Sequence, residues 1–318
     1  EGYINPYCSV IKEDGRVRIW YDFSQPTGPG PYDHLRRVCY AESEDGLHFV
    51  KPELGLHEIN GSKANNVVLP GVIGGCAVWI DPHAPPEHRY KTQTKVYPSG
   101  EFHMHSSPDG LQWKKFANID PRGSTDTQTV IFWDQRLKRY VFYSRDKSTT
   151  SEIDIRCRNV RRAEMTDLRK IKNTGLVIWP DALDRATYDV AKEGKGGTEW
   201  TPVDYYGATV FPYEEADRVY IMLAQAYWHW KRTPKTERSW PKITWLTEWP
   251  GTQDVQLAVS RDSKQFQRVG GRKPFLRLGL AGRFDSKWAW AMPNPIRMGD
   301  EIWIYYVGSN ANHNGVVD

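Results

Sequence analysis

Two aspartates, Asp126 and Asp204, stand at matching positions of a repeated strand pattern, each at the start of an apolar strand. Carboxylates that converge on one pocket can cleave a glycosidic bond, one acting as general acid and the other as base or nucleophile. Glu1 and Asp285 lie near the comparable places of other units, and Glu199 lies just before Asp204; each could supply a third carboxylate. For any single one of these acids, capping a strand or turn is the competing interpretation. The shared register of Asp126 and Asp204 favours the catalytic interpretation.

Side chains of several kinds near these acids are candidates for binding a substrate. They are Arg145, Trp228, His229, Trp288, Gln128 and Tyr205. An arginine can bind a sugar hydroxyl or carboxylate, although a surface ion pair is an equally good interpretation of Arg145. His103 and His105 share a strand face, but no third metal ligand is identifiable. We therefore predict no metal site and no other cofactor.

A turn motif, Ser-x-Asp-(Gly/Ser)-x-x-(Phe/Trp), occurs at 43–49, 107–113 and 260–266, with a degenerate copy at 162–168. Asp-Gly between apolar residues is typical of a tight hairpin. Upstream of each copy, an apolar strand, a turn and a second, mostly aromatic strand recur. A fifth strand pair at 294–306 has no turn motif after it. Five units of about four strands predict an all-β, five-bladed β-propeller whose last blade looks incomplete.

The whole chain, 1–318, is expected to form one propeller domain, since closed β domains of this size occur. The first strand of each blade lines the central channel of a propeller, so acids at these strands would face one another there. Residues 228–252 interrupt the strand pattern with a segment rich in Trp, Pro and Lys. We expect a functional loop, and a packing flap over a blade edge is the alternative.

Composition excludes some classes of function. The chain has 318 residues, a net charge of +4 and no long block of like charges, which argues against nucleic-acid binding. No apolar run is long enough to span a membrane. The arginines within 156–162 alternate with other residues as in a strand, and we expect a solvated strand face there. Four widely spaced cysteines, Cys8, Cys39, Cys76 and Cys157, are expected to be buried thiols.

Three parts of the chain, 126–145, 80–91 and 43–66, together resemble bacterial proteins related to the glycoside hydrolase family 32 and family 43 superfamily. The resemblance covers most of the chain and implies a five-bladed propeller that acts on glycans with carboxylates at its channel. The Trp-Met-Asn-Asp-Pro-Asn-Gly, Arg-Asp-Pro and Glu-Cys signatures of fructan-cleaving members are absent, which argues against invertase-like activity. Sialidases space the Asp and Gly of their turn motif by one residue, whereas Asp45 and Gly46 are adjacent here, which argues against a sialidase.

These features predict a glycoside hydrolase with a carbohydrate substrate and a periplasmic or secreted location. A non-catalytic glycan-binding or protein-interaction propeller is the rival from another class, and it would use the aromatic rims and residues 228–252. A third interpretation is a phosphorolytic relative, in which phosphate replaces water and Arg145 or Arg156 holds it. No feature of the sequence indicates an oligomeric state.

Overall fold

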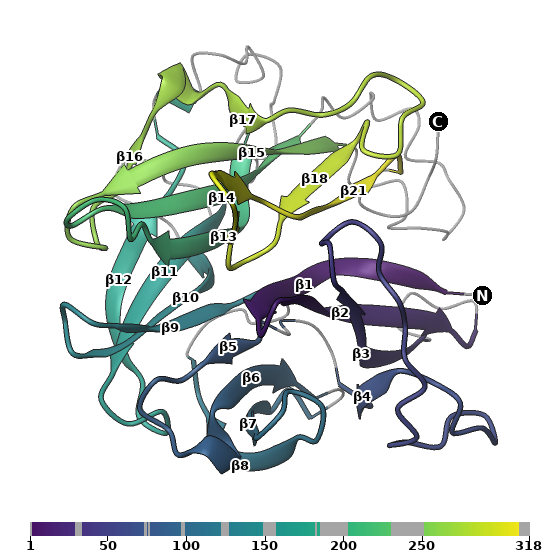
Figure 1. The fold of residues 1–318 in the computed structure, drawn as a ribbon. Coiled ribbons are helices and arrows are strands. Elements are labelled where there is room, and N and C mark those ends of the chain that lie inside the picture. The colour runs from purple at the N-terminus through teal and green to yellow at the C-terminus, as the bar shows by residue number, and fades with distance from the viewer. Residues whose placement is uncertain are drawn as a thin grey trace.

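The computed structural model is an all-β fold whose sheets surround a common centre (Figure 1). It describes residues 2–28, 34–72, 75, 77–96, 99–121, 127–148, 157–181, 183–184, 203–229 and 251–311. Within these residues, short 3₁₀ turns occur at η1 (Pro86–His88) and η3 (Gly270–Arg272). No helix in the described part of the chain is long and apolar enough to cross a membrane.

The strands form successive antiparallel sheets in chain order. The first sheet contains β1 (Tyr3–Glu13), β2 (Arg16–Pro26), β3 (His34–Ser43) and β4 (Val67–Pro70). The second sheet contains β5 (Trp79–Ile80), β6 (Tyr90–Lys95), β7 (Phe102–Ser107) and β8 (Lys114–Ile119). The third sheet contains β9 (Val130–Asp134), β10 (Arg139–Ser148), β11 (Cys157–Met165) and β12 (Lys172–Ile178).

The C-terminal part is less regular. What we call the fourth sheet contains β13 (Val203–Pro212), β14 (Tyr220–His229), β15 (Gly251–Ser260), β16 (Gln267–Arg268) and β17 (Pro274–Leu276). The last hairpin contains β18 (Trp288–Ala291), β19 (Ile296–Met298), β20 (Glu301–Trp303) and β21 (Tyr306–Ser309). Its strand β18 pairs with β21 and touches β15 in parallel at one position, while β19 pairs with β20.

The first strands of the second, third and fourth sheets lie next to one another. Strand β9 contacts both β5 and β13, and β1 contacts β19 and β21. Apolar side chains fill the spaces between successive sheets, for example Trp20 with Val78, Phe102 with Phe142, and Val141 with Val210. Sheets packed face to face around inner first strands fit a β-propeller. The all-β prediction is therefore confirmed, and the arrangement of the sheets fits a propeller.

The turn motif forms the hairpin between the third and fourth strands, as predicted. In each full copy the Asp carboxylate accepts hydrogen bonds of 2.8–2.9 Å from the backbone N–H groups two and three residues later. The Ser hydroxyl donates to the same carboxylate at 2.8–2.9 Å. The fourth position has positive φ in Gly46, Gly110 and Ser263, where glycine is favoured. The degenerate copy also makes a turn, in which Asp167 accepts from the Arg169 N–H at 3.0 Å.

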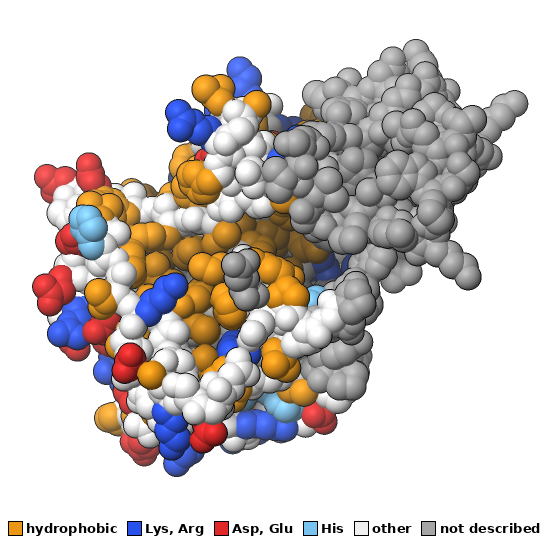
Figure 2. Space-filling model, turned by 90° about the vertical axis from the view of Figure 1, so that its right-hand side faces the viewer, with side chains coloured by type: hydrophobic (Ala, Val, Ile, Leu, Met, Phe, Trp, Pro, Cys, Tyr) orange, Lys and Arg blue, Asp and Glu red, His pale blue; other side chains and the backbone are white. Residues whose placement is uncertain are grey.

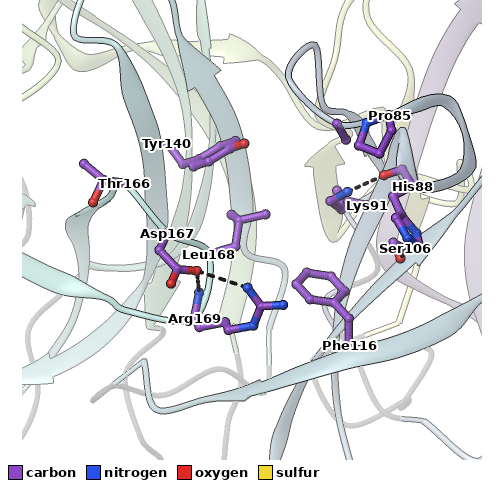
Figure 3. Close-up of a pocket in the computed structure, with 11 residues that line it drawn as sticks. Pro85, His88, Lys91, Ser106, Phe116, Tyr140, Thr166, Asp167, Leu168 and Arg169 are labelled. Carbon is purple, nitrogen blue, oxygen red and sulfur yellow. Dashed lines mark hydrogen bonds and ion pairs between the residues drawn. The ribbon is translucent and has the colours of Figure 1, made fainter.

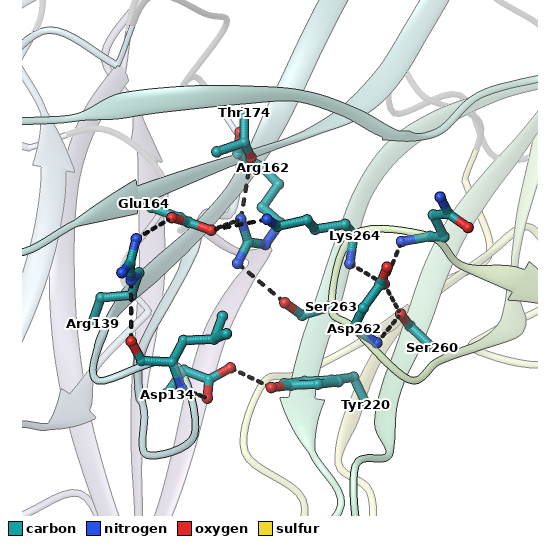
Figure 4. A network of polar contacts seen from close by, with 12 residues as sticks. Asp134, Arg139, Arg162, Glu164, Thr174, Tyr220, Ser260, Asp262, Ser263 and Lys264 are labelled. Carbon is teal, nitrogen blue, oxygen red and sulfur yellow. Dashed lines mark hydrogen bonds and ion pairs between the residues drawn. The ribbon is translucent and has the colours of Figure 1, made fainter.

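The described arginines of β11 do not form the expected solvated strand face, because Arg162 is buried and Arg158 and Arg161 are partly buried in ion pairs. Arg156 lies outside the described residues. Arg162 is completely buried and donates to Glu164 at 2.7 Å and to Ser263 at 3.1 Å (Figure 4). Arg139 of β10 donates to the same Glu164 at 2.7 Å, and this hydrogen bond links β10 to β11. Burial alone would raise the pKa of Glu164, but these arginines lower it to about 2. Because β11 is sandwiched between two sheets, its charges are neutralised by partners instead of water.

Other predictions concern the surface and the thiols. Cys8, Cys39 and Cys157 are buried free thiols, as predicted, and Cys76 lies outside the described residues.

Of the segment 228–252, only its ends are described, as the last residues of β14 and the first of β15. Figure 2 shows a face on which hydrophobic side chains gather in a hollow, with charged side chains to its left and below it.

Candidate active site

Asp204 lies on the inner strand β13 and forms a buried ion pair. The residue is 4% exposed, and Arg158 Nη1 from β11 donates a hydrogen bond to Asp204 Oδ2 at 2.7 Å. Burial lowers the pKa of Arg158, but the Asp204 carboxylate outweighs this effect and raises it above its ordinary value. The pair therefore holds an ionised carboxylate at the inner edge of the fourth sheet.

A wall of aromatic rings adjoins this pair. The guanidinium groups of Arg158 and Arg145 lie 4.7 Å and 4.9 Å from the ring centroid of Tyr206. The Tyr206 ring contacts Trp288 and Trp290 with centroid distances of 5.9 Å and 5.5 Å, edge to face. Tyr227 adds a fourth ring, 5.2 Å from Trp288. Tyr227, Trp288 and Trp290 are buried and pack as an apolar cluster, and Tyr206 is the partly buried ring beside the charged pair.

The cluster continues into the first sheet through Tyr7. Its ring is 5.4 Å from that of Trp290, and the Arg36 guanidinium lies 5.7 Å from its centroid. Arg36 pairs with the buried Asp22, donating from Nε at 3.1 Å, and Asn5 donates to the same oxygen at 3.2 Å. Burial lowers the pKa of Arg36 and Asp22 raises it, with a net increase. Two buried arginine–aspartate pairs thus flank one aromatic wall.

Asp22 and Arg36 were missed by sequence reasoning. The usable signal was an acid in the middle of an aromatic strand, Trp20-Tyr-Asp-Phe23, where an unpaired carboxylate would be unfavourable.

Asp254 is a second carboxyl near this end of the fourth sheet that sequence reasoning missed. It is 7% exposed, and Trp228 Nε1 donates a hydrogen bond to its Oδ2 at 2.8 Å. Its Oδ1 is buried, and no described residue hydrogen-bonds to it. Burial raises the pKa of Asp254 to about 7, against a smaller opposite effect of Trp228. This carboxyl therefore keeps its proton to a higher pH than an ordinary aspartate does.

The strand register relates the two acids. Asp204, Tyr227 and Gln253 are in line across β13, β14 and β15, and Asp254 is the next residue after Gln253. Successive side chains of a strand point to opposite faces, so Asp204 and Asp254 lie on opposite faces of the fourth sheet. The signal in the sequence was Gln253-Asp-Val255, an acid at the start of an otherwise buried strand.

Several predicted binding residues fall within this cluster. Arg145 and Trp288 contact it as described, and Gln128 lies just beside it. Trp228 lies on the other face of the fourth sheet, where it bonds to Asp254 and packs against the core shared with the third sheet. Gln128 Oε1 accepts from Trp290 Nε1 at 3.0 Å, and its amide nitrogen donates to the Cys8 carbonyl. Gln128, which precedes β9, thus connects Cys8 of β1 with Trp290 of β18.

Other predicted residues lie elsewhere. Tyr205 is in the core between the third and fourth sheets, and its hydroxyl donates to Gln256 at 3.1 Å. Asp285 lies just before β18 and accepts from the Tyr306 hydroxyl at 2.9 Å. Asp126, Glu199 and Glu1 fall outside the described residues, as does the side chain of His229. Their proposed roles remain predictions.

The two histidines considered for a metal have protein partners. His105 Nε2 lies 3.0 Å from the Thr94 hydroxyl, and His103 Nε2 lies 3.0 Å from a Glu101 carboxylate oxygen. Burial lowers the pKa of His105 to about 4. In the described part of the chain, no three His, Cys, Asp or Glu side chains are grouped to hold a metal ion.

Comparison of sequences gives a limited match. No protein-family model matches the chain. Two uncharacterized proteins of Mycobacterium tuberculosis are each 24% identical over 148 residues, which is 44% of this chain and 46% of each relative. The match thus spans less than half the length of these curated relatives.

Comparison of structures gives matches over nearly the whole chain. A β-1,2-mannobiose phosphorylase from Listeria innocua has a TM-score of 0.62 at 14% identity, covering 98% of this chain and 88% of that one. A member of the GH130 family of mannoside phosphorylases has a TM-score of 0.57 at 12% identity, covering 98% and 83%. A fructofuranosidase from Schwanniomyces occidentalis has a TM-score of 0.53 at 12% identity, covering 95% and 51%. At these identities the likeness shows the fold alone, a β-propeller-like fold that glycoside hydrolases use.

Proposed function

We propose that this protein cleaves glycosidic bonds of an oligo- or polysaccharide, with its active site around Asp204. The observation that carries the proposal is the buried Asp204–Arg158 pair beside the rings of Tyr206, Trp288 and Trp290. A carboxylate held ionised next to an aromatic wall suits the base or nucleophile of glycoside cleavage. The folds of the neighbouring glycoside-active enzymes support this class of function.

The proposed reaction needs a proton donor as well. Glycosidases separate the roles of two carboxyl groups by giving them different environments. Asp204 pairs with an arginine, whereas Asp254 is buried without one and its pKa is raised to about 7. We assign Asp204 to the base or nucleophile. Asp254 has a raised pKa but lies on the opposite face of the fourth sheet, so we do not pair it with Asp204. Asp126 stays a candidate for the acid or for the base. Glu199, Glu1 and Asp285 remain candidates for a third carboxylate.

The finer features of the proposal concern architecture and setting. We propose a single five-bladed propeller over 1–318 with an insertion at 228–252, related to the family 32 and family 43 superfamily. The partner is a carbohydrate, and a periplasmic or secreted location suits such a substrate.

Phosphorolysis is a second candidate, because two guanidinium groups lie against one ring. Arg145 and Arg158 both contact Tyr206, and two arginines can bind one phosphate. Two of the structural neighbours are named as mannoside phosphorylases or members of their family. Turnover that requires added inorganic phosphate and yields a sugar phosphate would support it over hydrolysis.

The test is product analysis with mannosides, including β-1,2-mannobiose, and with other glycan panels, in the presence and absence of phosphate. Asp204→Asn should lower turnover by about 10²–10⁴-fold, the usual contribution of an acid–base group. Because it leaves Arg158 buried without its charge partner, this variant should also lose stability.

A matched control separates these two effects. Glu164→Gln also removes a buried carboxylate from arginine partners, but it does so in the network between β10, β11 and the 260–264 turn. It should lose stability and keep the turnover of the folded fraction. Equal turnover in folded Asp204→Asn and wild type would remove Asp204 from the mechanism. A glycan that binds but stays intact would favour the non-catalytic propeller.

A further inference from the structure

A cavity lies between the second and third sheets, lined by residues other than those around Asp204. Its volume is about 370 Å³, within the size range of small-ligand sites. One wall comes from the second sheet and the η1 loop, with Lys91, Ser106 and Phe116 (Figure 3). The other comes from β10 and the turn after β11, with Tyr140 and Arg169 (Figure 3).

Lys91 is unusual because its side chain is deeply buried at a cavity wall. The residue is 5% exposed, although lysine is rarely buried unless it is paired. Its ammonium donates to the His88 carbonyl and lies 3.7 Å from Asp81 Oδ2. Burial lowers the pKa of Lys91, and Asp81 acts in the opposite direction. The Tyr140 hydroxyl is 3.1 Å from both Asp81 oxygens, which fixes this counter-ion behind the lysine.

Phe116 separates two cations in the cavity. Lys91 Nζ lies 5.6 Å from its ring centroid, and the Arg169 guanidinium lies 5.7 Å from it. Arg169 is itself 3.6 Å from Asp167, a pairing too long for a strong hydrogen bond. Each cation of the cavity therefore has one carboxylate near it, Asp81 for Lys91 and Asp167 for Arg169.

Hydroxyl and imidazole groups complete the polar lining. The Ser106 hydroxyl, on a residue that is 4% exposed, lies 3.1 Å from His88 Nδ1. Thr166 adds a second hydroxyl at the opposite wall, and Leu168 and Pro85 add apolar surface. The cavity thus combines donors, an acceptor carboxylate and small apolar areas, with no excess of either charge.

We propose that this cavity is a second saccharide-binding site, which takes a neutral sugar unit outside the active site. Each sugar hydroxyl both donates and accepts, so it can pair with Lys91, Arg169 and Asp167 without adding charge. A carboxylate or phosphate ligand would add charge to a site where each cation already has a counter-ion. The choice of ligand class rests on the proposed function, but the site is independent of Asp204.

The test is ligand-detected NMR with D-mannose, D-glucose and β-1,2-mannobiose as probes, next to sodium glucuronate and inorganic phosphate. The expected result is that a neutral sugar binds wild type and that Arg169→Ala weakens its binding about tenfold. Thr166→Trp should abolish binding by filling the cavity, and both positions are exposed enough for the protein to fold. Arg297→Ala, which removes an exposed, ion-paired arginine in the last hairpin, is the matched control and should bind as wild type does.

Other outcomes are equally decisive. Unchanged sugar binding in both Arg169→Ala and Thr166→Trp, or no sugar binding at all, would overturn the proposal. If glucuronate or phosphate binds more tightly than the neutral sugars, and the variants lose this binding, the assignment of a neutral sugar as the ligand would be wrong. Sugar binding that persists in Asp204→Asn would show that this cavity binds independently of the active site. A failure to detect glycoside turnover would then count against the proposed function and not against this binding site.

Discussion

At the scale of single residues, the buried carboxyl of Asp254 makes stability depend on pH. Its pKa is raised from 3.8 to about 7 by burial, so the folded state disfavours the ionised form. Its stabilising contribution is present in full below about pH 4 and is lost as the pH rises to about 7. Asp254→Asn removes the ionisable group and keeps an oxygen for the Trp228 hydrogen bond. We expect the variant to unfold at a higher temperature than wild type at about pH 8, and not at about pH 4.

Thermal unfolding of both proteins across this pH range checks the expectation. A difference in melting temperature that does not vary with pH would contradict the assignment of a protonated, buried carboxyl.

The sequence predicted residue types better than residue environments. Asp204 could be found because its register relative to Asp126 is a local property of the repeat. The burial of Arg158 and Arg162 could not, because the alternation of a strand is the same whether its other face meets water or another sheet. Asp22 and Asp254 carried the same ambiguity, since a charged residue in a strand is usually solvent-facing.

At the scale of elements, the turn motif was predictable because its hydrogen bonds join residues only two or three apart. Asp109 alone satisfies the N–H groups of Leu111 and Gln112. The last hairpin was predicted less well, since its pairing is split between β18–β21 and β19–β20. Such an interruption depends on packing against β1 and β15, which no local pattern encodes.

The turn glycines give a prediction at this scale. Gly110 has φ +76, and an added Cβ would lie 2.6 Å from Trp20 Cζ2. Gly15 has the same φ of +76 with no atom within 4 Å of such a Cβ. Gly15→Ala should therefore destabilise the fold by about 1–2 kcal/mol, the backbone penalty alone. Gly110→Ala should lose about 1–3 kcal/mol more, because it also displaces the buried Trp20.

Urea unfolding of the two variants measures both losses. Gly15→Ala is the matched control for the backbone term. Equal losses would mean that the space around Gly110 adjusts freely, contrary to tight packing between the first and second sheets.

At the scale of the whole molecule, the ring of sheets is joined at its centre by a few large side chains. Trp290, 1% exposed on β18, contacts Tyr7 of β1 and Tyr206 of β13. Its Nε1 donates to Gln128, which precedes β9 and bonds in turn to the Cys8 carbonyl. The same side chains form the wall beside Asp204, so closure of the fold and formation of the proposed site depend on one set of contacts.

This dependence predicts the effect of Trp290→Ala. Removing a buried tryptophan leaves a cavity and an unpaired Gln128 oxygen, and it should lower the free energy of unfolding by about 3–5 kcal/mol. Trp303→Ala is the control, because Trp303 lies half-buried on β20 and bonds to the exposed Glu301. Urea unfolding should show a clearly smaller loss for Trp303→Ala. Since Trp290 supports Tyr206, only Trp290→Ala should also weaken glycan binding at the active site. Comparable losses in both variants would mean that the central contacts are no more important than those of the outer hairpin.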